Sequence, residues 1–221
     1  MREEKTFAKG MNYYKLFWLF MIGCVGGVII ETFWCLLKKG VIESRSGLLY
    51  GPFNPVYGFG ALLMAVCLNP LQKRSRLWIF LGSALIGGGF EYLCSLFQEL
   101  AFGTVSWEYS HSFANLHGRT NLAFSVAWGI LGLIWVKNIF PTLNRWIEKI
   151  PRAVGVLLTW LFTVFMIFNM AISALAVYRQ SQRRMDIPAQ NQLDVFLDRH
   201  YPDDYLKKIY PNMQLAPERE K

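Results

Sequence analysis

Two glutamates within apolar segments are the residues of this sequence best placed to do chemistry. Glu31 lies in the apolar run 13–37, and Glu91 lies in the run 77–100. An ionisable side chain in hydrocarbon is costly unless it is paired or hydrated, so each glutamate marks a functional site. A buried carboxyl group can hold a polar ligand or, with a raised pKa, act as an acid or base.

Two arginines are the expected partners of these glutamates. Arg45 and Arg119 lie in the polar segments that follow the two glutamate-bearing runs. Guanidinium–carboxylate pairs are often bidentate, and arginine keeps its charge at every physiological pH. The four side chains allow two interpretations. They form either a ligand-binding or transport site, or two ion pairs that only hold helices together.

The segment 49–58, LYGPFNPVYG, is the second candidate for the site. Its two prolines and two glycines cannot form a regular helix. Broken backbone at membrane depth is tolerated only where it lines protein or a wet cavity. We therefore assign Tyr50, Asn54 and Tyr57 to the binding site. The alternative is an interfacial turn within a belt of aromatic side chains.

The loop 101–120 has the composition of a lid over a polar cavity, because it combines aromatic, acidic and hydroxyl groups. Its candidate binding residues are Trp107, Tyr109, Ser110, Asn115 and Arg119. The two histidines of the loop are too far apart for a helical zinc motif, and the four cysteines of the chain form no CxxC pair. Phosphate-binding and hydrolase motifs are also absent. We expect no metal or cofactor and assign no catalytic residue, and enzymatic activity stays an open question.

Apolar runs of about 20 residues must position these groups. The sequence is 53% hydrophobic and only 17% charged, and a helix of about 20 residues crosses a ~30 Å hydrocarbon layer. We predict an all-α integral membrane protein with a membrane domain at 1–178 and a polar, amphipathic tail at 179–221. The five predicted transmembrane helices lie at about 13–37, 52–68, 77–100, 121–139 and 153–178.

The net charge of +8 arises from lysines and arginines clustered between the apolar runs. This distribution is typical of anchors at a lipid headgroup surface, so membrane lipid is the expected partner and nucleic acid is not. More of these residues lie at the span ends that share a side with the N-terminus. The sequence therefore predicts a multi-pass protein of the cell membrane with a cytoplasmic N-terminus.

An internal repeat relates two helical hairpins, 13–68 and 77–139. The pattern GxxxE occurs at Gly27–Glu31 and again at Gly87–Glu91, 60 residues later. Tyr57-Gly58 lines up with Trp128-Gly129 at an offset of 71. Both hairpins start on the same side, so the predicted axis relating them runs along the membrane normal. The fifth helix, 153–178, lies outside this repeat, and chance similarity between Gly-rich apolar segments is the alternative.

A short amphipathic helix is predicted between Pro141 and Pro151. Apolar residues recur there at helical spacing from Leu143 to Ile150. Such a helix either lies on the inner membrane surface or docks into a groove of a partner.

Three motifs resemble one known family: LYGPFxPxYG at 49–58, WxYS at 107–110 and NxxGR at 115–119. The sequence is similar to the putative type IV ABC-transporter permease family of CmpB type. That family is found mainly in Firmicutes and is related to vertebrate transmembrane proteins of unknown function. The resemblance covers about 13–140 and includes Glu31 and Glu91, whereas Glu108 stands where the family has aspartate.

The resemblance implies a membrane transport or ligand-binding subunit with a Glu/Arg site that opens to the outer side. A permease of this kind needs a separate ATPase, and the segment Leu143–Ile150 is its expected docking site. A homo-oligomer is also compatible with the sequence. Two other functions stay open: an intramembrane enzyme acting on a lipid or lipid-linked headgroup, and a membrane scaffold.

Overall fold

The computed structural model describes residues 7–217, and its architecture is all-helical, as predicted. The longer helices are α1 (Tyr13–Lys39), α2 (Pro55–Cys67), α3 (Arg76–Phe102), α4 (Leu122–Ile134), α5 (Phe140–Glu148) and α6 (Arg152–Arg184). A 3₁₀ turn (Asn69–Leu71) follows α2, a π-helical turn (Trp135–Ile139) joins α4 to α5, and α7 (Gln192–His200) and α8 (Asp203–Ile209) end the chain. Four two-residue strands form two small antiparallel pairs: β1 (Thr104–Val105) with β4 (Gln214–Leu215), and β2 (Asn115–Leu116) with β3 (Thr120–Asn121).

Four helical segments of the described chain are long and apolar enough to cross a membrane, rather than the five predicted. The segment that falls short is α2, which has 13 residues and is therefore about 20 Å long at ~1.5 Å per residue. The broken segment before it explains the difference. Asn54 is in an extended conformation, and its side chain accepts a hydrogen bond from the backbone N–H of Val56, so the helix begins only at Pro55.

The fourth long segment is continuous from Leu122 to Glu148. The sequence predicted a separate surface helix beginning at Pro141. Instead, the π-helical turn leads directly into α5, and Pro141 stands in the first turn of that helix. A proline has no N–H to donate, and the first turn of a helix is where that donor is least needed.

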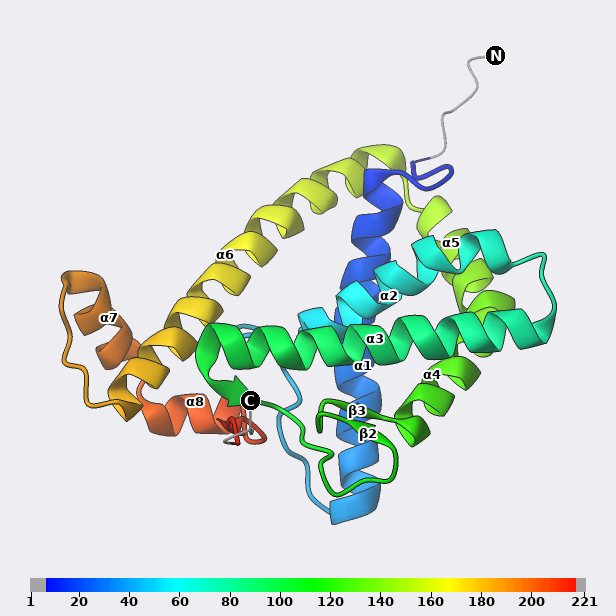
Figure 1. Cartoon of the computed structure of the whole chain (residues 1–221). Helices are drawn as coiled ribbons and strands as arrows, with labels where there is room; N and C mark the ends of the chain where they lie inside the picture. Colours follow the sequence, from blue (N-terminus) through cyan, green and yellow to red (C-terminus); the bar gives the residue numbers. More distant parts are fainter. Residues whose placement is uncertain (1–6, 218–221) are drawn as a thin grey trace.

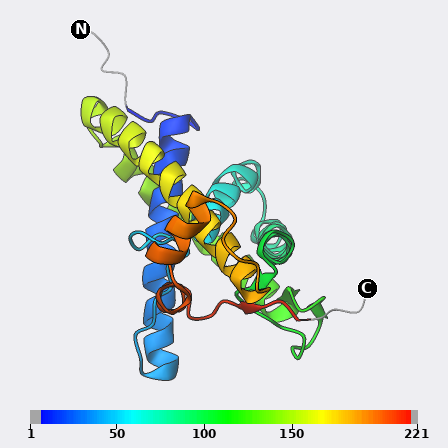
Figure 2. The ribbon, with the colours of Figure 1, turned by 90° about the vertical axis from the view of Figure 1, so that its left-hand side faces the viewer.

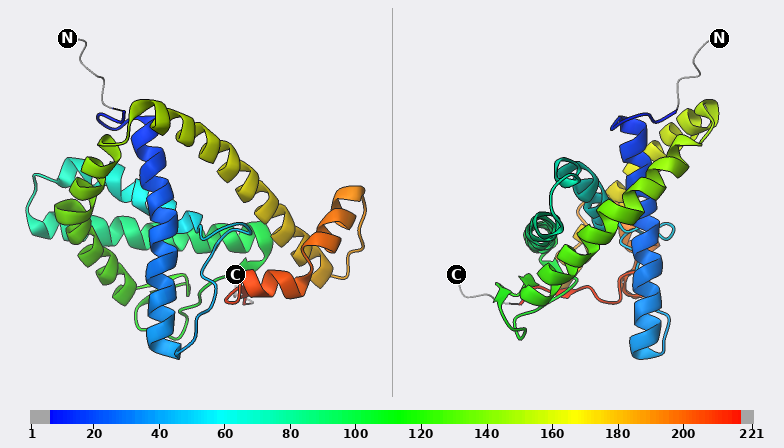
Figure 3. Two further views of the ribbon diagram at one scale, coloured as in Figure 1. Left: turned by 180° about the vertical axis from the view of Figure 1, so that it is seen from behind. Right: turned by 90° about the vertical axis from the view of Figure 1, so that its right-hand side faces the viewer.

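The long helices cross one another steeply (Figure 1). In that view α1 runs from top to bottom, α3 runs from right to left, and α6 passes diagonally. Figure 2 shows α3 nearly end-on while α1 stays upright, so the crossing is not an effect of projection. The C-terminal end of α1 lies at the bottom of the molecule, whereas the C-terminal ends of α3 and α6 lie toward α7 and α8 (Figure 3). The junction of α5 with α6 and the start of α1 lie at the top in the same views.

Both predicted hairpins contain the same close glycine–aromatic contact. A Cβ added to Gly27 would lie 2.1 Å from Cγ of Tyr57, and a Cβ added to Gly87 would lie 2.3 Å from Cγ of Trp128. These are the positions that the sequence repeat equates. The glycines therefore allow α2 to pack directly on α1, and α4 directly on α3.

A second close contact occurs in both hairpins, at the glycines that follow Tyr57 and Trp128. A Cβ on Gly58 would lie 2.6 Å from the ring of Phe20, and a Cβ on Gly129 would lie 2.6 Å from the ring of Phe80. The two phenylalanines are 60 residues apart and the two glycines are 71 apart, which are the offsets of the repeat. Equivalent positions of the two predicted hairpins therefore make the same two kinds of contact.

The C-terminal segment packs on α6 through α7 and α8. Leu197 and Leu206 are buried in one cluster with Ile172 of α6. Arg179, which is also buried, donates from Nε and Nη2 to the two carboxylate oxygens of Asp198, each at 2.9 Å. The tail was predicted to be amphipathic, but its pairing through β4 with β1, far away in sequence, was not predicted.

This docking is expected to depend on pH. The hydrogen bonds from Arg179, and then those from Arg183, hold the pKa of Asp198 below its ordinary value of 3.8. Because this pKa is lower in the docked state than in the unfolded state, the ionised carboxylate stabilises docking at pH values above the unfolded-state pKa. That stabilisation is lost as the pH falls through the pKa of the docked state. The protection of 192–209 against hydrogen exchange, measured relative to the intrinsic exchange rate at each pH, should therefore fall as the pH drops below about 4. An Asp198→Asn variant should show faster exchange already at neutral pH, and equal exchange in both chains would contradict this docking.

Candidate functional site

Glu31 on α1 is bound by a tyrosine from the neighbouring helix. The hydroxyl of Tyr57 donates a hydrogen bond of 2.6 Å to Oε2 of Glu31. Tyr57 reaches this position because its ring lies against Gly27, which precedes Glu31 by one helical turn. A phenol thus supplies the donor for this carboxylate.

Glu91 on α3 is bound by two hydroxyl groups. Tyr109 Oη donates to Oε1 at 3.1 Å, and Thr120 Oγ1 donates to Oε2 at 2.8 Å. The indole of Trp128, which is equivalent to Tyr57 in the repeat, is a further polar neighbour of this carboxylate. The same position of the following helix therefore places a polar side chain beside each glutamate: Tyr57 lies beside Glu31, and Trp128 lies beside Glu91.

Tyr109 binds Glu91 and also lies within the electrostatic influence of Glu31. It lies in the loop after α3, and its ring stacks on Phe124 at a centroid distance of 4.7 Å. Burial, followed by the negative charges of Glu91 and Glu31, raises the pKa of its phenol above the ordinary value. The phenol therefore stays protonated and acts as a donor, and both carboxylates act on it.

The two arginines bind other carboxylates than those predicted. Arg45 Nη2 pairs with Glu43 at 3.0 Å, and Arg119 Nη2 pairs with Glu99 at 2.8 Å. Among the ion pairs of residues 7–217, neither arginine reaches Glu31 or Glu91. The physical reason is the position of the competing acids. Glu43 and Glu99 lie at the polar ends of their segments, where an ion pair requires less desolvation.

The predicted residues of the segment 49–58 have separate roles. Asn54 caps α2, as described above, and donates from Nδ2 to the carbonyl of Arg45 at 3.2 Å. Tyr50 turns away to the C-terminal segment, where its hydroxyl lies 2.6 Å from that of Tyr201. Asn169 of α6 binds both backbone groups of Tyr50, accepting from its N–H at 3.2 Å and donating to its carbonyl at 2.7 Å. Only Tyr57 of this segment contacts a site glutamate.

The loop after α3 is held together by its own side chains. Trp107 Nε1 donates to the carbonyl of Arg119 at 2.9 Å, and Asn115 Nδ2 donates to the carbonyl of Ser110 at 3.0 Å. The hydroxyl of Ser110 donates to Glu108 at 2.6 Å. These hydrogen bonds hold the loop in a shape that lets Tyr109 reach Glu91. The other loop residues predicted for the site bond within the loop or to its flanking residues.

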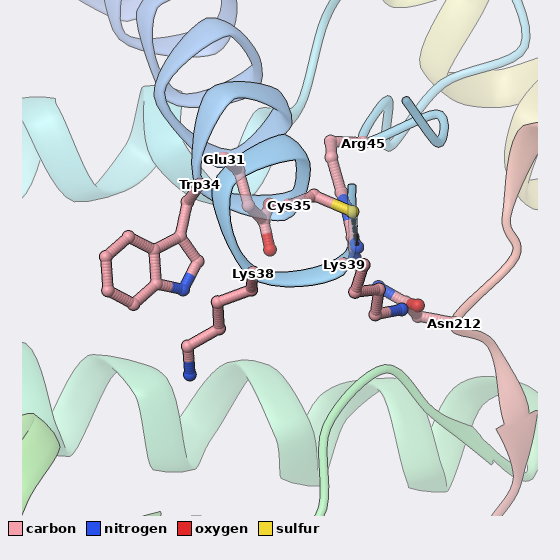
Figure 4. Close-up of a pocket in the computed structure, with 7 residues that line it drawn as sticks. All are labelled: Glu31, Trp34, Cys35, Lys38, Lys39, Arg45 and Asn212. Atoms are coloured by element: carbon pink, nitrogen blue, oxygen red, sulfur yellow. Dashed lines mark hydrogen bonds between the residues drawn. The ribbon is translucent and has the colours of Figure 1, made fainter. Parts of the chain in front are cut away.

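A pocket of about 260 Å³ opens beside Glu31, at the C-terminal end of α1 (Figure 4). Its lining residues are Glu31, Trp34, Cys35, Lys38, Lys39, Arg45 and Asn212. The sequence had suggested only Glu31 and Arg45 as binding residues here. Lys38 lies seven residues after Glu31 on the same helix face, and that spacing is the signal that could have found it. Within the described chain no cluster of three potential metal ligands occurs.

Comparison with known families gives one match. The profile of the family described as "Putative ABC-transporter type IV" matches residues 18–174. The chain belongs to this family. The resemblance seen in the three motifs is thus confirmed. No curated protein and no solved structure matches the chain significantly.

The match to the type IV ABC-transporter family begins within α1 and ends within α6. It therefore includes both glutamates, all but the first five residues of the two predicted hairpins (13–68 and 77–139), and the loop that carries Tyr109. The helices α7 and α8 and the strand β4 lie beyond the matched region. The part of the chain that makes the site is accordingly the part that the family profile describes.

Proposed function

We propose that this chain is the membrane subunit of a transport or ligand-binding complex, and that Glu31 and Glu91 form its ligand site. The observation that carries the proposal is the position of Tyr109, which binds Glu91 and lies in the field of Glu31. Two carboxylates with hydroxyl donors around them suit a ligand that brings hydrogen-bond donors or positive charge. Family membership supports a role in transport.

The loop that carries Tyr109 is the proposed lid of this site. It lies on the same side of the molecule as the C-terminal end of α1 (Figure 1). In the predicted orientation this side is the outer one. A ligand leaving the site would have to displace the phenol of Tyr109 from Glu91.

The ATPase that such a subunit requires is proposed to contact the exposed face of α5. Leu143 and Ile147, the apolar residues expected to dock a partner, are buried within the chain itself. The opposite face presents Trp146 and Arg145 to the exterior. An aromatic and an arginine side chain are the residue types enriched at the centres of protein interfaces.

The proposed site is tested by Glu91→Gln and Tyr109→Phe in the complex with the ATPase that co-purifies with the chain. Each change removes one charged or hydroxyl partner and keeps the shape of the side chain. We expect ligand affinity, measured by ligand-stimulated ATP hydrolysis, to fall about tenfold or more, because a hydrogen bond to a charged group contributes about 1.5–3 kcal/mol. Tyr178→Phe, on the exposed side of α6, is the matched control and should leave stimulation unchanged.

The other candidate functions predict different results in the same experiment. A scaffold would lose thermal stability in these variants without any change in a ligand-dependent rate. An enzyme acting on a lipid headgroup would lose turnover while still binding the lipid. Unchanged stimulation in both variants would contradict the proposed site.

A further inference from the structure

The pocket at the end of α1 carries more positive than negative side chains. Lys38, Lys39 and Arg45 line it together with one carboxylate, that of Glu31 (Figure 4). Glu43 neutralises part of this charge, because it pairs with Lys39 and with Arg45, each at 3.0 Å. Lys38 has no ion pair within residues 7–217. The pocket is therefore suited to an anion.

Arg45 has a buried donor that makes no hydrogen bond within residues 7–217. Its side chain is only 8% exposed, and its Nη2 donates to Glu43 and to Cys35 Sγ. Its Nε is buried and has no hydrogen-bond partner among the described residues. The Arg45 side chain also lines the pocket, and phosphate oxygens match a planar guanidinium well.

The helix face beside the pocket is apolar and unpartnered. Ile30, Phe33 and Leu37 of α1 are 72%, 60% and 64% exposed, respectively. Residues three and four apart share a helix face, so these side chains form one stripe that adjoins Trp34 at the edge of the pocket. Lys38 Nζ lies over the Trp34 ring, 5.0 Å from its centroid. Tryptophan and lysine together are typical of the headgroup level of a membrane.

We propose that this pocket binds the phosphate group of an anionic phospholipid, whose acyl chains lie along the apolar stripe of α1. Lys38 binds the phosphate oxygens, and Lys39 and Arg45 add positive charge to the pocket. Trp34 covers the junction between headgroup and chains. The apolar stripe favours a lipid over a soluble phosphate compound, because a soluble ligand would leave it uncovered. This pocket adjoins the proposed ligand site, because Glu31 lines both, but it does not require Glu91 or Tyr109 to bind anything.

The test is native mass spectrometry of the full chain in detergent, with three probes: phosphatidylglycerol, phosphatidylcholine of the same acyl chains, and inorganic phosphate. Phosphatidylglycerol should be retained in preference to phosphatidylcholine. The double variant Lys38→Gln/Lys39→Gln should bind phosphatidylglycerol about thirtyfold more weakly, since each basic residue near an anionic headgroup contributes about 1 kcal/mol. Both lysines are exposed, so the variant should keep the melting temperature of the native chain.

The matched control is Lys73→Gln/Arg74→Gln, which removes two exposed charges from the turn between α2 and α3. It should bind phosphatidylglycerol as the native chain does. Equal retention of the two lipids, or equal binding by the Lys38/Lys39 variant, would overturn the proposal. Inorganic phosphate binding as tightly as phosphatidylglycerol would overturn the lipid assignment. Neither result depends on the ligand-stimulated rate that tests the proposed function.

Discussion

Replacing Lys15 with methionine should destabilise the chain by about 3–5 kcal/mol, because it would leave a carboxylate without its buried partner. Lys15 is only 1% exposed, and its Nζ binds both Asn144 and Glu148 of α5. The methionine would fill the space of the lysine stem but provide no donor. Since α5 continues α4, the contacts of Lys15 with Asn144 and Glu148 join the second hairpin to the start of α1.

The second half of this experiment is the double variant Lys15→Met/Glu148→Leu. Removing both charges replaces a broken ion pair with an apolar contact, which often restores stability. We expect the melting temperature in detergent to fall by roughly 6–20 °C in the single variant, since each kcal/mol corresponds to about 2–4 °C at this chain length. The double variant should recover much of that loss. An unchanged melting temperature in Lys15→Met would show that the pair contributes no stability.

Alanine at Gly27 or Gly87 should also destabilise the chain strongly, by about 1–3 kcal/mol or more. The added methyl groups would lie 2.1 and 2.3 Å from Cγ of Tyr57 and of Trp128. These ring atoms lie next to the backbone and cannot swing away, so the helices of each hairpin must separate. In the Gly27 variant Tyr57 would also move from Glu31, which links the packing of the hairpin to the site.

Two neighbouring glycines provide matched controls for this prediction. A Cβ on Gly26 or Gly89 would meet nothing within 4 Å. Alanine there changes only helix propensity, in the stabilising direction and by up to ~1 kcal/mol. The melting temperature should therefore fall in the Gly27 and Gly87 variants. It should stay unchanged or rise in the Gly26 and Gly89 variants. Equal effects at all four positions would contradict the close packing of both hairpins.

The long helices were predictable because an apolar run of about 20 residues forms a helix when it crosses a membrane. The predicted run 13–37 became Tyr13–Lys39, and the run 77–100 became Arg76–Phe102. The errors occurred at prolines. Pro52 and Pro55 shortened the second helix, while Pro141 was tolerated in a first helical turn and did not separate α5 from α4. Periodicity alone cannot distinguish a proline that ends a helix from one that begins it.

The glutamates of the candidate site were predictable, but most of their partners were not. A carboxyl group in an apolar run is conspicuous because its burial is costly. Thr120 gave no such signal, since a threonine next to a helix start is commonplace, yet it binds Glu91. The arginines were assigned by charge alone, and Glu43 and Glu99 compete for them at lower desolvation cost. The pairing of β1 with β4 joins segments that are about a hundred residues apart, and no local pattern encodes it.

The most direct test of the shared site is an experimental structure of the chain in lipid nanodiscs, determined by cryo-electron microscopy with a bound antibody fragment. Our account predicts that the Tyr109 phenol lies between the two carboxylates, with Tyr57 bound to Glu31 and Thr120 bound to Glu91. A map in which either glutamate points to the acyl chains, or in which Tyr109 faces away from both, would contradict it.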